Sequence, residues 1–75
     1  MKTDSSTSKV LIKINGENKF IPQNISILEL LETYKINNGR VVIELNKVIL
    51  KKESFQSVIL NEKDEIEIVT FVGGG

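Results

Sequence analysis

Apolar and polar residues alternate along three stretches of the chain, in the period-two pattern of strands that bury one face. These stretches are residues 9–15, 40–45 and 65–68. Extending the last stretch keeps the same alternation, which puts Val69 and Phe71 on its water-facing side. Val42 is the apolar exception on the water-facing side of the middle stretch. The pattern therefore predicts exposed apolar side chains near the end of the last strand.

A helical pattern begins at Ser26. Ser26 and Glu29 have the spacing of a capping box, in which each side chain pairs with the backbone amide of the other residue. Apolar residues then recur at the spacing of one helix face, at Ile27, Leu30, Leu31 and Tyr34. Residues 37–39, Asn-Asn-Gly, tolerate the left-handed conformation of a C-cap. We therefore expect the helix to end there.

Short polar turns connect the remaining stretches. Residues 15–18 predict a hairpin turn from the first strand into a second one at residues 19–21. Pro22 should end this second strand, because proline lacks an amide donor. Residues 46–47 predict a similar turn into residues 48–50. Each of the two turns therefore predicts a β-hairpin.

The order of elements is strand, strand, helix, strand, short strand, strand, which predicts an α+β fold. We expect a mixed sheet of four to five strands with one main helix packed on one face. The first and last strands should be parallel neighbours at its centre.

The aromatic side chains are expected to contribute to the core. Phe55 is expected to fill the core beneath an irregular crossover, and Phe20 and Tyr34 are expected in the core or at its edge.

Composition limits the chemistry that this chain can perform. It has 75 residues, ten Lys and Arg against ten Asp and Glu, and neither cysteine nor histidine. The usual nucleophilic thiolates, imidazole bases and zinc ligands are therefore missing, so the chain is not expected to be an enzyme. The balanced charge predicts no nucleic-acid partner. No apolar run approaches the roughly 20 residues of a membrane span, so a cytoplasmic protein without a membrane partner is expected.

The chain ends in three glycines, Gly73, Gly74 and Gly75. Glycine packs poorly and has a high entropic cost of ordering, so a globular domain gains little from such a run. A partner protein with a narrow channel does benefit, because residues without Cβ let its backbone close in on the chain. We therefore predict a flexible tail at residues 73–75. The other predicted divisions of the chain are a disordered leader at residues 1–8 and a folded domain at residues 9–72.

With these elements the chain resembles the ubiquitin-like β-grasp proteins and, among them, the family of sulfur carrier proteins of thiamine biosynthesis. The resemblance rests on residues 27–31 of the helix, residues 42–46 of the third strand, and residues 64–75, where a strand of alternating acidic and aliphatic residues leads to the glycines. It implies that an E1-like adenylyltransferase adenylates the Gly75 carboxyl with ATP. No cofactor would be bound by the chain itself.

The resemblance also implies the later partners. A cysteine desulfurase or a sulfurtransferase would supply the sulfur that turns the adenylate into a thiocarboxylate, and thiazole synthase would receive it. Gly73 and Gly74 would thread into the partner's active site. Val42, Val69, Phe71 and Val72 are the predicted docking surface. The alternatives are the small subunit of molybdopterin synthase, a protein modifier joined to lysines, and a β-grasp interaction module with an idle tail.

Overall fold

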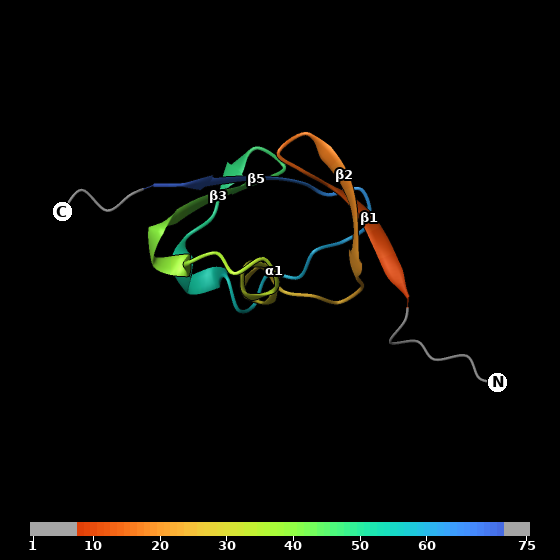
Figure 1. Ribbon diagram of the computed structural model, residues 1–75, viewed down its shortest axis with the longest axis horizontal. Coiled ribbons are helices and arrows are strands. Elements are labelled where there is room, and N and C mark those ends of the chain that lie inside the picture. The colour runs from red at the N-terminus through yellow and green to blue at the C-terminus, as the bar shows by residue number, and fades with distance from the viewer. Residues whose placement is uncertain (1–7, 72–75) are drawn as a thin grey trace.

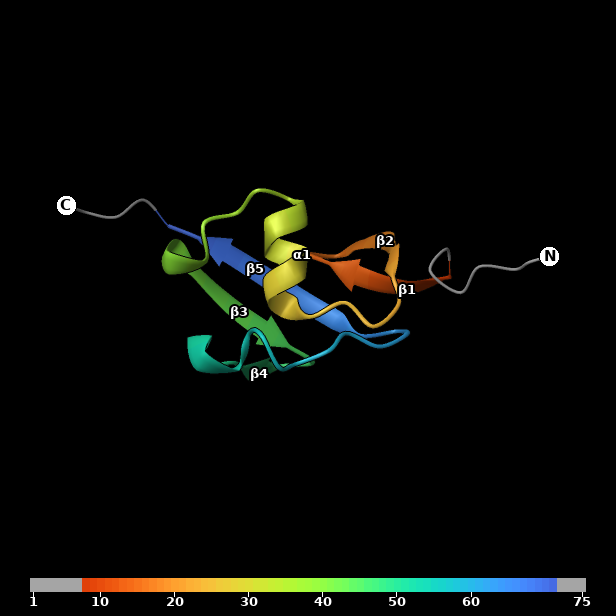
Figure 2. The same ribbon diagram turned by 90° about the horizontal axis from the view of Figure 1, so that it is seen from below.

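One five-stranded sheet and a helix that packs against it make up the computed structural model, which describes residues 8–71 (Figure 1). The strands are β1 (Lys9–Ile14), β2 (Glu17–Pro22), β3 (Val41–Leu45), β4 (Val48–Ile49) and β5 (Glu65–Thr70). The helix is α1 (Ile27–Thr33), and the short 3-10 helices are η2 (Asn38–Arg40) and η3 (Lys52–Ser54). Figure 2 shows α1 crossing in front of the sheet at a steep angle to β5.

The strand order across the sheet is β2-β1-β5-β3-β4. β5 is therefore the central strand, although it is the last in the sequence. It runs parallel to β1, with Ile14 opposite Ile66, and antiparallel to β3, with Ile43 opposite Ile68. The predicted parallel contact between the first and last strands is thus confirmed.

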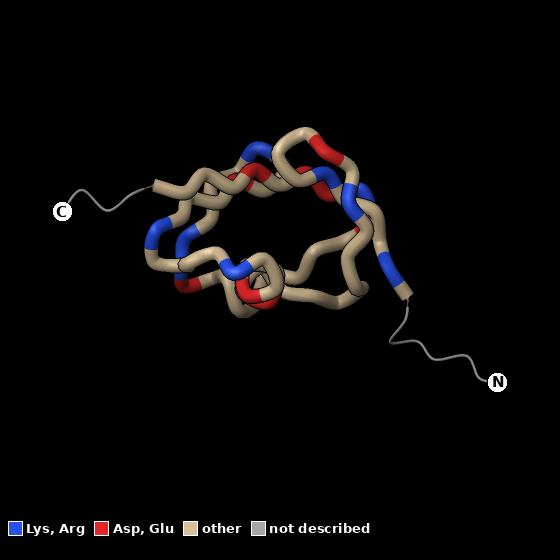
Figure 3. Tube along the Cα trace, viewed as in Figure 1, with Lys and Arg blue, Asp and Glu red and all other residues tan. Residues whose placement is uncertain are grey.

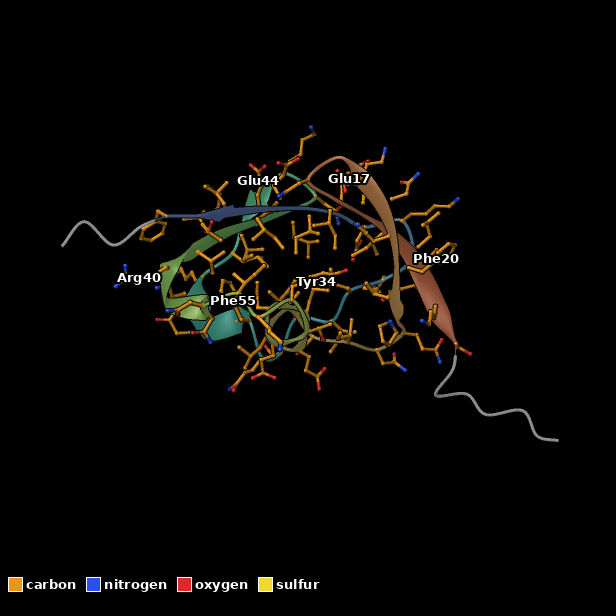
Figure 4. All side chains as sticks on the ribbon, in the orientation of Figure 1. Glu17, Phe20, Tyr34, Arg40, Glu44 and Phe55 are labelled. Carbon is orange, nitrogen blue, oxygen red and sulfur yellow. The ribbon has the colours of Figure 1, made fainter. Side chains whose placement is uncertain are left out.

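The core lies between the sheet and α1. Its buried apolar side chains are Ile12, Ile14, Ile21, Ile25, Ile27, Leu30, Leu31, Val41, Ile43, Phe55, Leu60, Ile66 and Ile68. Phe55 follows η3 and closes one side of this core, as predicted (Figure 4). Residues 57–60 do not form a full strand, and Ile59 makes one isolated bridge to Ser26.

The capping box at the start of α1 is confirmed. The Glu29 amide donates a hydrogen bond to Ser26 Oγ at 3.1 Å, and the Ser26 amide donates to Glu29 Oε1 at 2.9 Å. These bonds satisfy backbone donors that the first turn of a helix leaves unpaired. The helix therefore starts at the residue that its sequence specifies.

The predicted end of α1 at residues 37–39 is wrong, because the helix stops at Thr33. Lys35 takes the left-handed conformation with φ +60°, and the Ile36 amide donates to the Leu31 carbonyl at 2.8 Å. This is a Schellman motif, in which the chain turns so that Ile36 packs against the core. Asn37 instead caps η2, where its Oδ1 accepts a hydrogen bond from the Gly39 amide at 2.8 Å.

Two aromatic side chains are less buried than expected. Phe20 is 69% exposed, so the prediction that it lies in the core or at its edge is wrong. β2 pairs with β1 from Glu17 onward, in a register that points Ile21 inward and therefore Phe20 outward, opposite Leu11. Tyr34 is the C-cap residue of α1 and is 42% exposed.

Candidate functional site

The candidate site is the end of β5, because this strand leads to the C-terminal glycines. β5 lies between β1 and β3, and its last residue is Thr70. The predicted roles of Val72, Gly73, Gly74 and Gly75 fall on residues outside the described part of the chain. They stay predictions, and the geometry below concerns the residues that lead up to them.

Backbone pairing with β3 fixes the strand up to Phe71. Val42 lies opposite Val69, and the Phe71 amide donates to the Arg40 carbonyl at 3.0 Å. The second contact continues the β3 ladder one residue beyond each strand end. Backbone hydrogen bonds thereby fix the path of the chain up to Phe71.

Three apolar side chains lie exposed around this point, and we call Val42, Val69 and Phe71 the β5-end patch. Their exposed fractions are 42%, 58% and 48%. Val42 and Val69 lie opposite each other on the face of the sheet that α1 does not cover. Phe71 follows one residue beyond the end of β5, and the alternation predicts the same face for it. Exposed apolar residues that cluster at a chain end are typical of a docking surface.

On the β1 side of β5, the side chain of Asn15 makes the hydrogen bonds that the backbone of a neighbouring strand would otherwise make. β1 ends at Ile14 and turns away, with Asn15 at φ +50° and Gly16 at φ +84°. The Ile68 amide donates to Asn15 Oδ1 at 2.7 Å, and Asn15 Nδ2 donates to the Ile68 carbonyl at 3.1 Å. The Asn15 amide therefore extends the pairing along β5 beyond the end of β1.

A second asparagine holds the beginning of β5 in a similar way. Asn46 has φ +49° in the turn between β3 and β4, and its Oδ1 accepts a hydrogen bond from the Glu65 amide at 2.9 Å. The backbone amide of Asn46 donates a hydrogen bond to the Glu65 carbonyl at 2.7 Å. Asn15 and Asn46 thus anchor β5 from two turns that are distant in the sequence.

Sequence reasoning had assigned Asn15 and Asn46 to turns only. Asparagine adopts positive φ more readily than most residues, so a turn explains each of them without any further contact. One sequence feature could have indicated that these two side chains bind β5. Both two-residue turns begin with asparagine, and both follow strands that flank β5.

Replacing Asn15 with alanine should destabilise the fold by about 1–3 kcal/mol, because the Ile68 amide and carbonyl lose their partners. Asn24→Ala is the matched control. Asn24 also has positive φ, +65°, and none of the side-chain hydrogen bonds within residues 8–71 involves it. Urea unfolding of both variants separates the loss of the amide from the conformational penalty of alanine. Equal losses would contradict the role assigned to the Asn15 side chain.

The described part of the chain offers no obvious place for a metal ion. Within residues 8–71, no three acidic side chains come together in a metal-binding arrangement, and the sequence has neither histidine nor cysteine. The geometry of the site is that of a fixed strand end beside an exposed apolar patch. Such an arrangement can present a chain end to another protein.

None of the helices within residues 8–71 is long and apolar enough to cross a membrane.

A mixed sheet with β5 at its centre and one helix across one face makes this a ubiquitin-like β-grasp protein. The chain belongs to the ThiS family, which matches residues 8–75. The family that the sequence motifs indicated is thereby confirmed.

Relatives of known sequence agree with this assignment. The chain is 41% identical over 66 residues to the sulfur carrier protein ThiS of Bacillus subtilis, covering 87% of this chain and all of that protein. It is 41% identical over 68 residues to the protein ycf40 of Pyropia yezoensis, covering 91% of this chain and 96% of that protein. A third similarity, to the thiazole synthase of Paramagnetospirillum magneticum, is 36% over 62 residues and spans 83% of this chain but 19% of that protein.

A solved structure has the same fold. The crystal structure of the thiamine biosynthesis protein ThiS from Geobacter metallireducens is similar with a TM-score of 0.77 and 28% sequence identity. The similarity covers 88% of this chain and 100% of that one. The fold predicted from the sequence is therefore confirmed.

Proposed function

We propose that this protein is a sulfur carrier of thiamine biosynthesis that carries sulfur on the carboxyl group of Gly75. An E1-like adenylyltransferase joins this carboxylate to the α-phosphate of ATP, and pyrophosphate leaves. The outer sulfur of a persulfide on a cysteine desulfurase or a sulfurtransferase then displaces AMP, which gives an acyl disulfide. A thiol reduces the S–S bond of this intermediate and releases the thiocarboxylate. The activation step is needed because a free carboxylate has no adequate leaving group.

The observation that carries the proposal is the way in which β5 is held. β3 binds the central strand on one side as far as Phe71, and Asn15 binds it on the other side at Ile68. A partner that docks on the sheet would therefore find the chain that leads to the glycines in a defined place as far as Phe71. Preorganisation of this kind lowers the entropic cost of association.

The β5-end patch is the proposed docking surface for the adenylyltransferase, and Val72 extends it by sequence. Aromatic and aliphatic side chains at the centre of an interface contribute most of the binding energy in protein complexes. Phe71 is half exposed and is the only aromatic residue of the patch, so it is the expected anchor.

Thiazole synthase is the proposed recipient of the sulfur. The thiazole synthase of Paramagnetospirillum magneticum contains a segment similar to this chain. A carrier-like segment within such an enzyme supports a functional interaction between a sulfur carrier and thiazole synthase. The chain itself acts as a co-substrate in this scheme, and the partners provide the catalytic groups.

The test is adenylation by the E1-like adenylyltransferase of the same organism. Purified protein, enzyme and ATP are mixed, and pyrophosphate release is followed. A cysteine desulfurase, cysteine and a thiol reductant are then added, and intact mass spectrometry looks for replacement of one carboxyl oxygen by sulfur. Absence of pyrophosphate release with the wild-type protein would refute the proposal.

Phe71→Asp should weaken binding to the adenylyltransferase by about 2 kcal/mol or more, as for a central interface residue. The melting temperature should change little, because the side chain is about half exposed. Phe20→Asp is the matched control, since Phe20 is also an exposed aromatic but lies on the edge strand β2. Binding titrations and thermal melts measure both effects. A large loss of melting temperature in Phe71→Asp would mean that Phe71 belongs to the core.

A further inference from the structure

Two glutamates lie directly opposite each other on adjacent central strands. Glu44 on β3 pairs with Glu67 on β5, and the register directs both side chains away from α1. Figure 4 shows Glu44 on the side of the sheet opposite the helix, and Figure 3 shows acidic segments in the region where β3 and β5 lie in Figure 1. Like charges in directly opposed positions destabilise a sheet.

Neither carboxylate has a structural role within residues 8–71. Other acidic residues do, since Glu29 caps α1, Glu62 accepts a hydrogen bond from the Leu11 amide at 3.0 Å, and Asp64 accepts one from the Asn61 amide at 2.7 Å. Glu44 and Glu67 take part in no side-chain hydrogen bond among the described residues, and the ion pair found there joins Lys19 to Glu17 at 3.6 Å. Stability of the isolated domain therefore does not explain the pair.

The pair adjoins the β5-end patch. Along β5 the water-facing residues are Glu65, Glu67, Val69 and, beyond the strand, Phe71. The Glu44–Glu67 pair therefore lies two residues from the Val42–Val69 pair, a step of about 7 Å along a strand. A protein that covers the patch must also cover or border these two carboxylates.

We propose that the partner that docks on the β5-end patch places an arginine or a lysine between Glu44 and Glu67. The inference rests on the proposed function, because it assumes that a partner covers this face, and it commits to the E1-like adenylyltransferase as that partner. One cation would satisfy both carboxylates and remove their mutual repulsion. Arginine suits the position best, since its planar group offers several donors to two acceptors at once.

The charge pattern also predicts how the two proteins meet. The chain has no net charge, with ten basic and ten acidic residues, so any attraction comes from the local arrangement. A negative pair beside an apolar patch attracts a basic surface in the correct orientation. Such complementarity acts mainly on the association rate, and salt weakens it.

The experiment uses Glu44→Gln, Glu67→Gln and the double variant in the full chain, with the adenylyltransferase as the probe. Glu32→Gln is the control, because it removes the same charge from α1, on the other side of the molecule. Association rates are measured by stopped flow at low and high salt, and thermal melts are recorded for each variant. We expect the double variant to associate about tenfold more slowly at low salt and to lose most of its salt dependence. Its melting temperature should stay the same or rise.

The opposite signs of the two readouts make the test decisive. A double variant that associates at the wild-type rate, or with the same salt dependence as Glu32→Gln, overturns the inference. A marked fall in its melting temperature does so as well, because the carboxylates would then stabilise the fold. If the wild-type protein neither binds the enzyme nor is adenylated, the proposed function itself fails. That outcome is distinct from a failure of the charge pair.

Discussion

Deletion of Gly75 should abolish adenylation and leave the melting temperature unchanged within error. The truncated chain ends about 3.5 Å short of its former reach, so its carboxylate no longer meets the α-phosphate of ATP in the partner's active site. The buried side chains of the described core all precede Thr70, and glycine contributes no side chain to it. Pyrophosphate release with the E1-like adenylyltransferase measures the loss, and a thermal melt measures stability.

Two further variants separate chain length from chain width. One alanine added after Gly75 should also prevent adenylation, because it carries the carboxylate past the phosphate and adds a methyl group. Gly74→Val keeps the length and the terminal residue, yet it should be nearly as harmful, since a β-branched side chain is stiff and wide. All three proteins should bind the enzyme through the β5-end patch.

The outcomes discriminate between the functions that share this fold. Adenylation of the truncated chain at the wild-type rate would mean that the C-terminus is not the reactive end, and the carrier proposal would fail. Adenylation of the wild-type chain without a sulfur-containing product would favour a protein modifier. A thiocarboxylate that is consumed by a molybdopterin synthase large subunit, and not by thiazole synthase, would favour the other pathway.

Leu30→Ala should destabilise the protein by about 2–5 kcal/mol, because it leaves a cavity where α1 packs on the sheet. Leu30 has no exposed surface and belongs to the central cluster of the core. Small domains have a free energy of unfolding of about 5–15 kcal/mol, so this single change should leave a substantial fraction unfolded under mild denaturant. Urea unfolding followed by circular dichroism measures the shift of the midpoint.

Leu28→Ala is the matched control on the same helix. Leu28 is only partly buried at the edge of the core, so the same truncation should cost clearly less than at Leu30. Similar losses for the two variants would show that burial does not rank these positions as the structure does. An unchanged midpoint for Leu30→Ala would contradict the packing of α1 itself.

Local features of this chain could be predicted because they depend on neighbours in the sequence. The alternation at residues 41–45 and 65–70 placed Ile43 and Ile68 inside without knowledge of their partners. Ser26 and Glu29 determine the start of α1 within one turn of helix. Such signals are carried by spacing alone, since side-chain direction follows the period of each element.

The C-terminal end of α1 and the orientation of Phe20 were decided by packing. The helix stops where Ile36 can turn back onto the core, and this required a left-handed lysine in place of the asparagine or glycine that local preference favours. Phe20 faces water because β2 must pair with β1 in the register that buries Ile21. Local propensity predicts structure poorly where the burial of another residue contributes more free energy than the local preference does.

By itself, the sequence determined the strands, the start of the helix, the β-grasp order and the glycine end that suggests a carrier. The tertiary structure alone decided that the Asn15 side chain binds Ile68, 53 residues away, and that Glu44 faces Glu67. The reason is physical: both contacts depend on which strands are neighbours in the sheet and in which register they pair. Pairing between strands distant in the chain is set by the fold as a whole, because a shift of one residue would turn every side chain of a strand to the other face.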